Sequence, residues 1–277
     1  MTPKSIIKQF IPPIFLKLRT LFQNPKSINS NLWFGKFNSW EAAKKDSSGY
    51  NAYEILEKVK ESLLKVKNGE AIYERDSVLF DKIEYSWPLL TGLMWVAAQN
   101  NGNLNVLDFG GSLGSTYFQN RLFLKSMKNV NWNIVEQELF VKCGKDFFES
   151  EELKFFKNIE NCLDNQKPNL ILLSCVLPYV EKPYELLSEI ISYGFKYIIF
   201  DRMPFFEKDI PHRITIHKVD PQIYKATIPT HIFNKFEFVG FLEKRFELIS
   251  DFDSELEIEL SDGTRITNKG FIYRIKP

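Results

Sequence analysis

From residue 104 onward, short apolar runs alternate with stretches of helical spacing. Strands are expected at 104–109, 132–135, 154–156, 170–175 and 197–200, and helices at about 115–125, 138–148 and 183–192. Continuous apolar strands that alternate with helices are typical of a parallel sheet covered on both faces. The runs 246–252, 256–260 and 271–275 follow without helices between them, so we expect antiparallel strands at the edge of the sheet. The pattern predicts an α/β protein.

The first hundred residues have a different pattern. Residues 1–30 carry five Lys or Arg and no acid, a local charge of +5, with apolar residues between them. Two interpretations stay open: a basic amphipathic arm that touches an anionic membrane through residues 1–22, or an arm packed on the domain. Residues 31–50 have the composition of an aromatic-rich connector. The apolar spacing in 51–69 and 88–98 predicts two helices. We therefore expect an arm (1–30), a helical cap (31–103) and a cofactor-binding domain (104–277).

Composition narrows the functional classes. The 36 basic and 35 acidic residues give no overall field that would concentrate nucleic acid, so no nucleic-acid partner is expected. Three widely spaced cysteines without a CxxC pair indicate neither a disulfide framework nor a zinc knuckle, and no acid and histidine pairs have metal-ligand spacing. No cleavage site follows the N-terminal apolar run. We expect a cytoplasmic protein without a metal, in peripheral contact with the inner membrane if residues 1–22 bind lipid.

The most informative stretch is Asn-Val-Leu-Asp-Phe-Gly-Gly-Ser-Leu-Gly-Ser at 105–115, where an apolar strand leads into a helix. Glycines there let the backbone approach a ligand, and open parallel sheets bind ligands at the carboxyl ends of their strands. The dinucleotide-binding fingerprint is G-x-G-x-x-G. If Gly111 and Gly114 are aligned to its last two glycines, Phe109 stands where its first glycine belongs, which argues against a nicotinamide cofactor. Asp108 at the strand tip suits a cationic ligand such as S-adenosylmethionine. The predicted loop residues are Asp108, Gly110, Gly111, Ser112 and Gly114.

Two other strand ends support the same ligand. Glu136 follows the second strand, where a carboxylate can accept both hydroxyls of a ribose, and Gln137 is its neighbour. The fourth strand ends in residues that could form a wall for the adenine and the methionine: Ser174, Cys175, Val176 and Leu177.

A resemblance enters on these residues. The DxGGxxG loop, the Glu after the second strand and the seven-strand layout resemble the class I S-adenosylmethionine-dependent methyltransferases, which implies a Rossmann-like sheet. Longer stretches resemble one methyltransferase family encoded in bacterial surface-polysaccharide (capsule or O-antigen) clusters. They are 39–43, 73–90, 107–121, 132–137, 172–184, 198–205 and 223–229. His217 and Pro178 depart from that family, which commonly has Gln at both positions.

Methyl transfer to a hydroxyl needs a general base near the methyl group. All three histidines fall between the fifth strand and the terminal strands, and we take His212 or His217 as candidates. Asp201 is a further candidate, as a base or as a group that orients one, although it could equally form a structural network with Arg202. The candidates for acceptor binding are Tyr85, Trp87, Tyr179, Arg202 and Arg213.

The sequence thus predicts a methyltransferase that uses S-adenosylmethionine. The expected acceptor is an oxygen of a sugar, or of a phosphorylated or phosphoramidate precursor of a surface glycan. Two alternatives stay open: a nicotinamide-dependent sugar oxidoreductase, and a non-catalytic partner of this fold in a glycan-assembly complex.

Overall fold

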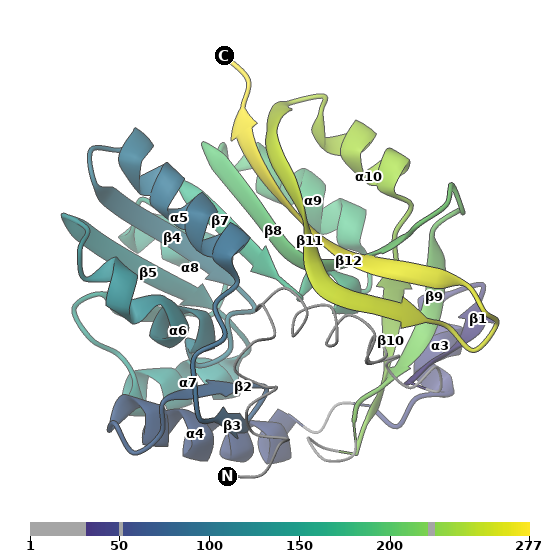
Figure 1. The fold of residues 1–277 in the computed structure, drawn as a ribbon, viewed down its shortest axis with the longest axis horizontal. Helices are drawn as coiled ribbons and strands as arrows, with labels where there is room; N and C mark the ends of the chain where they lie inside the picture. Colours follow the sequence, from purple (N-terminus) through teal and green to yellow (C-terminus); the bar gives the residue numbers. More distant parts are fainter. Residues whose placement is uncertain (1–31, 50–51, 221–224) are drawn as a thin grey trace, which may run out of the picture.

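The computed structural model describes residues 32–49, 52–220 and 225–277, so the arm expected at 1–30 lies outside the described residues. A seven-stranded sheet with the order β11-β12-β8-β7-β4-β5-β6 forms its centre (Figure 1). In chain order its strands are β4 (Asn103–Phe109), β5 (Asn129–Val135), β6 (Leu153–Phe156), β7 (Leu170–Ser174), β8 (Tyr197–Phe206), β11 (Phe246–Glu259) and β12 (Arg265–Ile275).

The topology of this sheet confirms the expected α/β class. Strands β4, β5, β6, β7 and β8 are parallel, and their spatial order is that of the first five strands of a Rossmann fold. The C-terminal strands differ from the expectation in two ways. β12 lies between β8 and β11 and is antiparallel to both, so it is not an edge strand. The runs expected as separate strands at 246–252 and 256–260 form the single 14-residue strand β11, with a register shift after Ser254.

Helices cover both faces of the sheet because the strand side chains alternate between them. On β7, Leu170 and Leu172 join one apolar cluster, and Ile171 and Leu173 join the other. The first cluster includes α4 (Ala52–Lys67), α5 (Trp87–Gln99), α6 (Ser115–Leu124) and α7 (Glu138–Phe147). The second includes α8 (Ile159–Asn165), α9 (Pro183–Ser192) and α10 (Lys235–Leu242).

Helices α8 and α10 were not expected from the sequence. Both begin at an asparagine whose side chain accepts a hydrogen bond from the backbone three residues on, Asn158 from Asn161 N and Asn234 from Glu237 N. Each is short, at seven and eight residues, and too short for its apolar periodicity to stand out. The described residues contain no helix that is both long enough and apolar enough to cross a bilayer.

A second, three-stranded sheet has the order β1-β9-β10. Its strands are β1 (Trp33–Phe37), β9 (Arg213–Lys218) and β10 (Thr227–Ile232). The expected connector over 31–50 therefore contains β1 and a helix, α3 (Trp40–Lys45), and packs beside the segment between β8 and α10 (Figure 1). A hairpin of β2 (Tyr73–Arg75) and β3 (Val78–Phe80) interrupts the helices of the expected cap. The division of the chain at residues 30 and 103 stays a prediction.

Candidate functional site

The glycine loop joins β4 to α6 at the carboxyl edge of the sheet. The Asp108 side chain is only 1% exposed, and Trp132 Nε1 donates a hydrogen bond to its Oδ2 at 2.9 Å. A Cβ on Gly111 would lie 2.5 Å from this carboxyl group, so only glycine fits above it. Burial raises the pKa of Asp108 to about 7. Asp108 therefore lies beneath the loop and supports it, and its direct contact with a cationic ligand stays a prediction.

The loop meets the end of β7 at the point where the strand order reverses. Gly110 has a φ of +71°, and a Cβ there would lie 2.4 Å from Val176 Cγ2. Ser112 also has a left-handed backbone, with a φ of 54°, which is unusual for a residue with a side chain. Gly114 is the N-cap of α6. The structure thus brings the predicted β4 and β7 residues together at the topological switch point, where such sheets bind ligands.

Glu136 lies beside this loop, directly after β5. Its carboxylate accepts hydrogen bonds from the backbone N–H groups of Ser112 and Gln137, the second at 2.7 Å. Burial raises its pKa, and these two hydrogen bonds oppose the rise. The residue is partly exposed, and its carboxylate ties the β4–α6 loop to the start of α7. Gln137 itself is exposed and is the N-cap of α7.

The ends of β7 and β8 form a second polar group. Ser174 Oγ donates to Asp201 Oδ2 at 2.9 Å and accepts from Arg202 Nη2 at 3.0 Å. Arg202 Nε lies 3.3 Å from Asp201 Oδ2 in an ion pair, and Ser254 Oγ donates to Asp201 Oδ1 at 3.4 Å. Asp201 is 2% exposed. Its carboxylate is occupied by these neighbours, as the structural-network interpretation expects.

His217, on β9, lies against Tyr179, which follows the end of β7. Its ring stacks on Trp33 with the centroids 4.3 Å apart, and its Nδ1 lies 3.1 Å from the Tyr179 hydroxyl. Tyr179 belongs to the short helix η2 (Leu177–Tyr179) and also hydrogen-bonds the Cys175 thiol. Burial lowers the pKa of His217 to about 4, an effect that the Asp76 carboxylate partly opposes. Tyr179, Cys175 and His217 therefore form one connected group beside the carboxyl edge.

Asp76 was not among the predicted site residues. It lies at the turn of the β2–β3 hairpin, and its charge acts on the pKa of both His217 and Cys175. Asp76 and Ser77 have φ values of 52° and 66°. Two consecutive left-handed residues with side chains are costly, and such strain tends to occur at functional sites. The hairpin turn thus presents an exposed carboxylate to the candidate site.

Glu74 on the same hairpin was also missed. Its side chain is 1% exposed, accepts a hydrogen bond from Ser77 N at 3.1 Å and accepts another from the hydroxyl of Ser115, the first residue of α6. Burial raises its pKa to about 7. The sequence signal was a glutamate inside a short strand-like segment, a position where acids are uncommon.

The other predicted residues lie elsewhere. His212 Nε2 is 2.7 Å from His231 Nδ1, in a pair that packs against Trp40 and Phe233. Arg213 forms an ion pair with Asp262 at 2.7 Å. Tyr85 and Trp87 pack against Phe123 in the last turn of α6, at the opposite end of that helix from the glycine loop.

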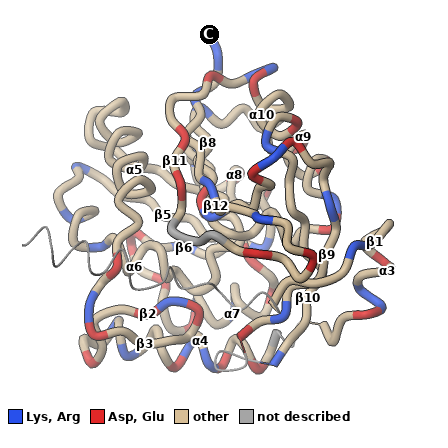
Figure 2. The backbone as a smooth tube through the Cα atoms, turned by 45° about the vertical axis from the view of Figure 1, so that its right-hand side comes forward, with Lys and Arg blue, Asp and Glu red and all other residues tan. Residues whose placement is uncertain are grey.

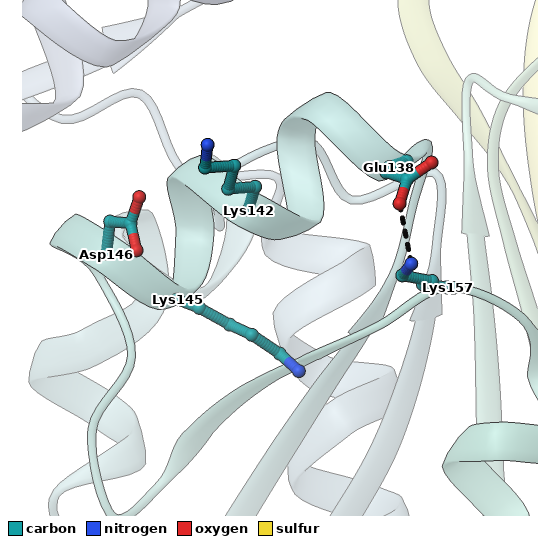
Figure 3. A pocket seen from close by; sticks show the side chains of 5 residues that line it. All are labelled: Glu138, Lys142, Lys145, Asp146 and Lys157. Carbon is teal, nitrogen blue, oxygen red and sulfur yellow. Dashed lines mark hydrogen bonds and ion pairs between the residues drawn. The ribbon is translucent and has the colours of Figure 1, made fainter.

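A surface hollow of about 280 Å³ lies over α7 (Figure 3). It is lined by Glu138, Lys142, Lys145, Asp146 and Lys157, and the ion pair of Glu138 and Lys157, 2.6 Å long, lies at one end of it. None of the predicted site residues is among these lining side chains. Within the described ranges, no group of three or more His, Cys, Asp or Glu could hold a metal ion, and the expectation of a metal-free protein stays a prediction.

Comparisons with known proteins give a likeness of fold. No protein-family model and no curated protein matches the sequence. The N-terminal domain of EvdMO1, crystallised in the presence of SAH and D-fucose, is 12% identical and covers 82% of this chain and 98% of its own, with a TM-score of 0.49.

Two further solved structures are S-adenosylmethionine-dependent methyltransferases. The protein from Clostridium acetobutylicum ATCC 824 is 13% identical and covers 68% of this chain and 91% of its own, with a TM-score of 0.43. The protein from Methanosarcina mazei is 13% identical and covers 64% of this chain and 96% of its own, with a TM-score of 0.43. The chain resembles all three in fold.

Proposed function

We propose that the protein is an S-adenosylmethionine-dependent methyltransferase. The observation that carries the proposal is the position of Glu136, a partly exposed residue whose carboxylate lies beside the glycine loop, where Gly110 and Gly111 admit no Cβ. A carboxylate at the tip of the second strand suits a pair of ribose hydroxyls, and a loop backbone without side chains at Gly110 and Gly111 suits the methionine end. When bound, the cofactor supplies an electrophilic methyl group carried on a sulfonium.

The proposed acceptor is a hydroxyl of a sugar or of a phosphorylated precursor of a surface glycan. Support comes from the side chains beside the carboxyl edge, where Arg202, Tyr179 and Asp76 offer the donors and the acceptor that hydroxyls and phosphates need. The resemblance of the long sequence stretches to a surface-polysaccharide family supports the same class. We place this activity in the cytoplasm, with residues 1–22 as a contact to the inner membrane.

Within this proposal His217 is the base. The His217 imidazole would accept the proton that the acceptor hydroxyl loses when it takes the methyl group supplied by the bound cofactor. A pKa of about 4 keeps His217 neutral at pH 7, and the Tyr179 hydroxyl beside Nδ1 leaves Nε2 for the acceptor. His212 is less suited because its Nε2 already lies against His231.

Calorimetry with S-adenosylhomocysteine tests the cofactor assignment. Glu136→Ala should weaken binding by more than tenfold, about 1.4 kcal/mol or more, because the ribose loses its carboxylate. Glu138→Ala is the matched control, since Glu138 is exposed, two residues away and paired with Lys157. Equal affinity in wild type and Glu136→Ala would refute the ribose assignment. Binding of NADH in place of S-adenosylhomocysteine would favour the oxidoreductase, and binding without methyl transfer to any crude glycan acceptor would favour the non-catalytic partner.

A further inference from the structure

An exposed apolar surface lies along α5 and the end of α6. We call it the α5 patch and define it by Tyr85, Trp87, Met94, Leu122 and Phe123. Trp87 is 58% exposed, Leu122 is 68% and Met94 is 36%. Tyr85, Trp87 and Phe123 touch one another, with ring centroids 5.0 to 5.9 Å apart, so the end of α6 and the start of α5 present one continuous surface.

The five side chains of this patch are uncharged; an exposed acid, Glu84, directly precedes Tyr85, and cations follow Phe123 on the other border. Residues 85–103 contain no Asp, Glu, Lys or Arg, and Figure 2 shows α5 uncharged along its length. The segment 121–128 carries Arg121, Lys125 and Lys128 and no acid. Lys125 follows the last residue of α6, and Lys128 N donates to Gly102 O at 2.9 Å, so the second lysine lies beside the end of α5. Both lysines are exposed.

We propose that the α5 patch binds an anionic lipid surface. Exposed Trp and Tyr rings next to aliphatic side chains are suited to the boundary between headgroups and acyl chains. Lysines at the border attract anionic headgroups. The charge pattern argues against a water-facing helix, because such a helix normally carries charged residues on its outer face. The residues of the patch are other than 1–22, and the proposal does not depend on the proposed methyl transfer.

The position of α5 relates the α5 patch to the candidate site. α5 and α6 pack into the same apolar cluster, on one face of the sheet. A lipid surface against the α5 patch would therefore lie on the same side of the sheet as the glycine loop's helix, α6.

Sedimentation of the full chain with lipid vesicles tests the proposal. The wild type should bind vesicles of phosphatidylcholine with about 30% phosphatidylglycerol more strongly than vesicles of phosphatidylcholine alone. The double variant Trp87→Ser/Leu122→Ser should bind at least about tenfold more weakly, because it removes the two most exposed apolar side chains of the patch. Phe236→Ser is the matched control, since Phe236 is 71% exposed on α10, and it should bind as the wild type does.

A second variant separates charge from apolar contact. Lys125→Gln/Lys128→Gln should weaken binding to the anionic vesicles about tenfold and leave binding to neutral vesicles unchanged. Circular dichroism should show the same secondary structure for all variants. The proposal is overturned if the wild type does not bind, or if the double variant binds as the wild type does, which would assign binding to residues 1–22. It is also overturned if sedimentation equilibrium shows a wild-type dimer that the double variant abolishes, because the occupant would then be a second copy.

Discussion

At the scale of single residues, Glu74 links the β2–β3 hairpin to the start of α6. Its two oxygens accept from Ser77 N and from the Ser115 hydroxyl, and its pKa is raised to about 7 by burial. A carboxyl group that is protonated more readily in the folded state stabilises the fold most at low pH. This contribution is fully present below the unfolded pKa near 4.5 and is lost as pH rises through 7.

Glu74→Gln should therefore flatten the pH dependence of stability. Between pH 5 and pH 8 the free energy of unfolding should fall more steeply in the wild type than in the variant, by about 2–3 kcal/mol. Urea denaturation at several pH values measures this difference, and Asp108 and the histidines contribute equally to both proteins. Glu61→Gln, an exposed position on α4, is the control and should leave the slope as in the wild type. Parallel curves for wild type and Glu74→Gln would show that Glu74 ionises normally.

The comparison of Glu136 with Glu74 and Asp76 shows which residues the sequence could predict. Glu136 follows an apolar strand at a fixed distance after the glycine loop, so its neighbours in the chain were enough to place it at the carboxyl edge. Glu74 meets Ser115, 41 residues away in the chain. Asp76 reaches His217 only because a hairpin and a second sheet bring them together. Contacts of this kind have no local signal.

At the scale of elements, the β4–α6 loop depends on the missing side chain of Gly111. Gly111→Ala places a methyl group 2.5 Å from the Asp108 carboxyl, so the loop must shift. We expect a loss of about 1–3 kcal/mol in the free energy of unfolding and at least tenfold weaker binding of S-adenosylhomocysteine. Urea denaturation and calorimetry measure the two effects.

Gly240 provides the control for this loop. It lies in α10, where a Cβ would point into open space, so Gly240→Ala should stabilise the protein by about 0.5–1 kcal/mol and leave binding unchanged. If Gly111→Ala bound S-adenosylhomocysteine as tightly as Gly240→Ala, the loop would not be part of the cofactor site.

The elements with a strong local pattern were predicted well. The helix expected at 183–192 is α9, and the strands around the glycine loop lie where the apolar runs are. Strands β1, β9 and β10 were missed because each has only five or six residues, and the pairing of β1 with β9 joins segments distant in the chain. The pairing of β12 between β8 and β11 was missed for the same reason, since strand order is a property of the sheet.

At the scale of the whole molecule, Trp33 of the small sheet contacts both the central sheet and the candidate base, His217. It is 7% exposed, stacks on His217 and packs in a cluster with Phe206 of β8 and Ile266 of β12. Burial against this ring contributes to the low pKa of His217. The environment of His217 therefore depends on a residue from the start of the described chain.

Trp33→Ala should lower the free energy of unfolding by about 3 kcal/mol because it opens a cavity in this cluster. Water that enters the cavity should raise the pKa of His217 from about 4 toward its ordinary value of 6.5, as measured by NMR titration of the imidazole. Binding of S-adenosylhomocysteine should stay unchanged, because the glycine loop does not touch Trp33. Trp87→Ala, at an exposed tryptophan, is the control, and an unmoved His217 titration in Trp33→Ala would contradict the prediction.

The pairing of β1 with β9 has a consequence for the time course of synthesis. Thr215 Oγ1 donates to Phe34 O across 181 residues of chain, so β1 leaves the ribosome long before its partner exists. Until β9 emerges, the backbone groups of residues 33–37 lack this sheet partner. An unpaired strand can instead form hydrogen bonds with a strand of another chain and so promote aggregation. The Gly110–Gly114 loop and Glu136 can assemble from residues made earlier than β9. His217 is made after both, so the residues of the proposed cofactor pocket leave the ribosome before the proposed base does.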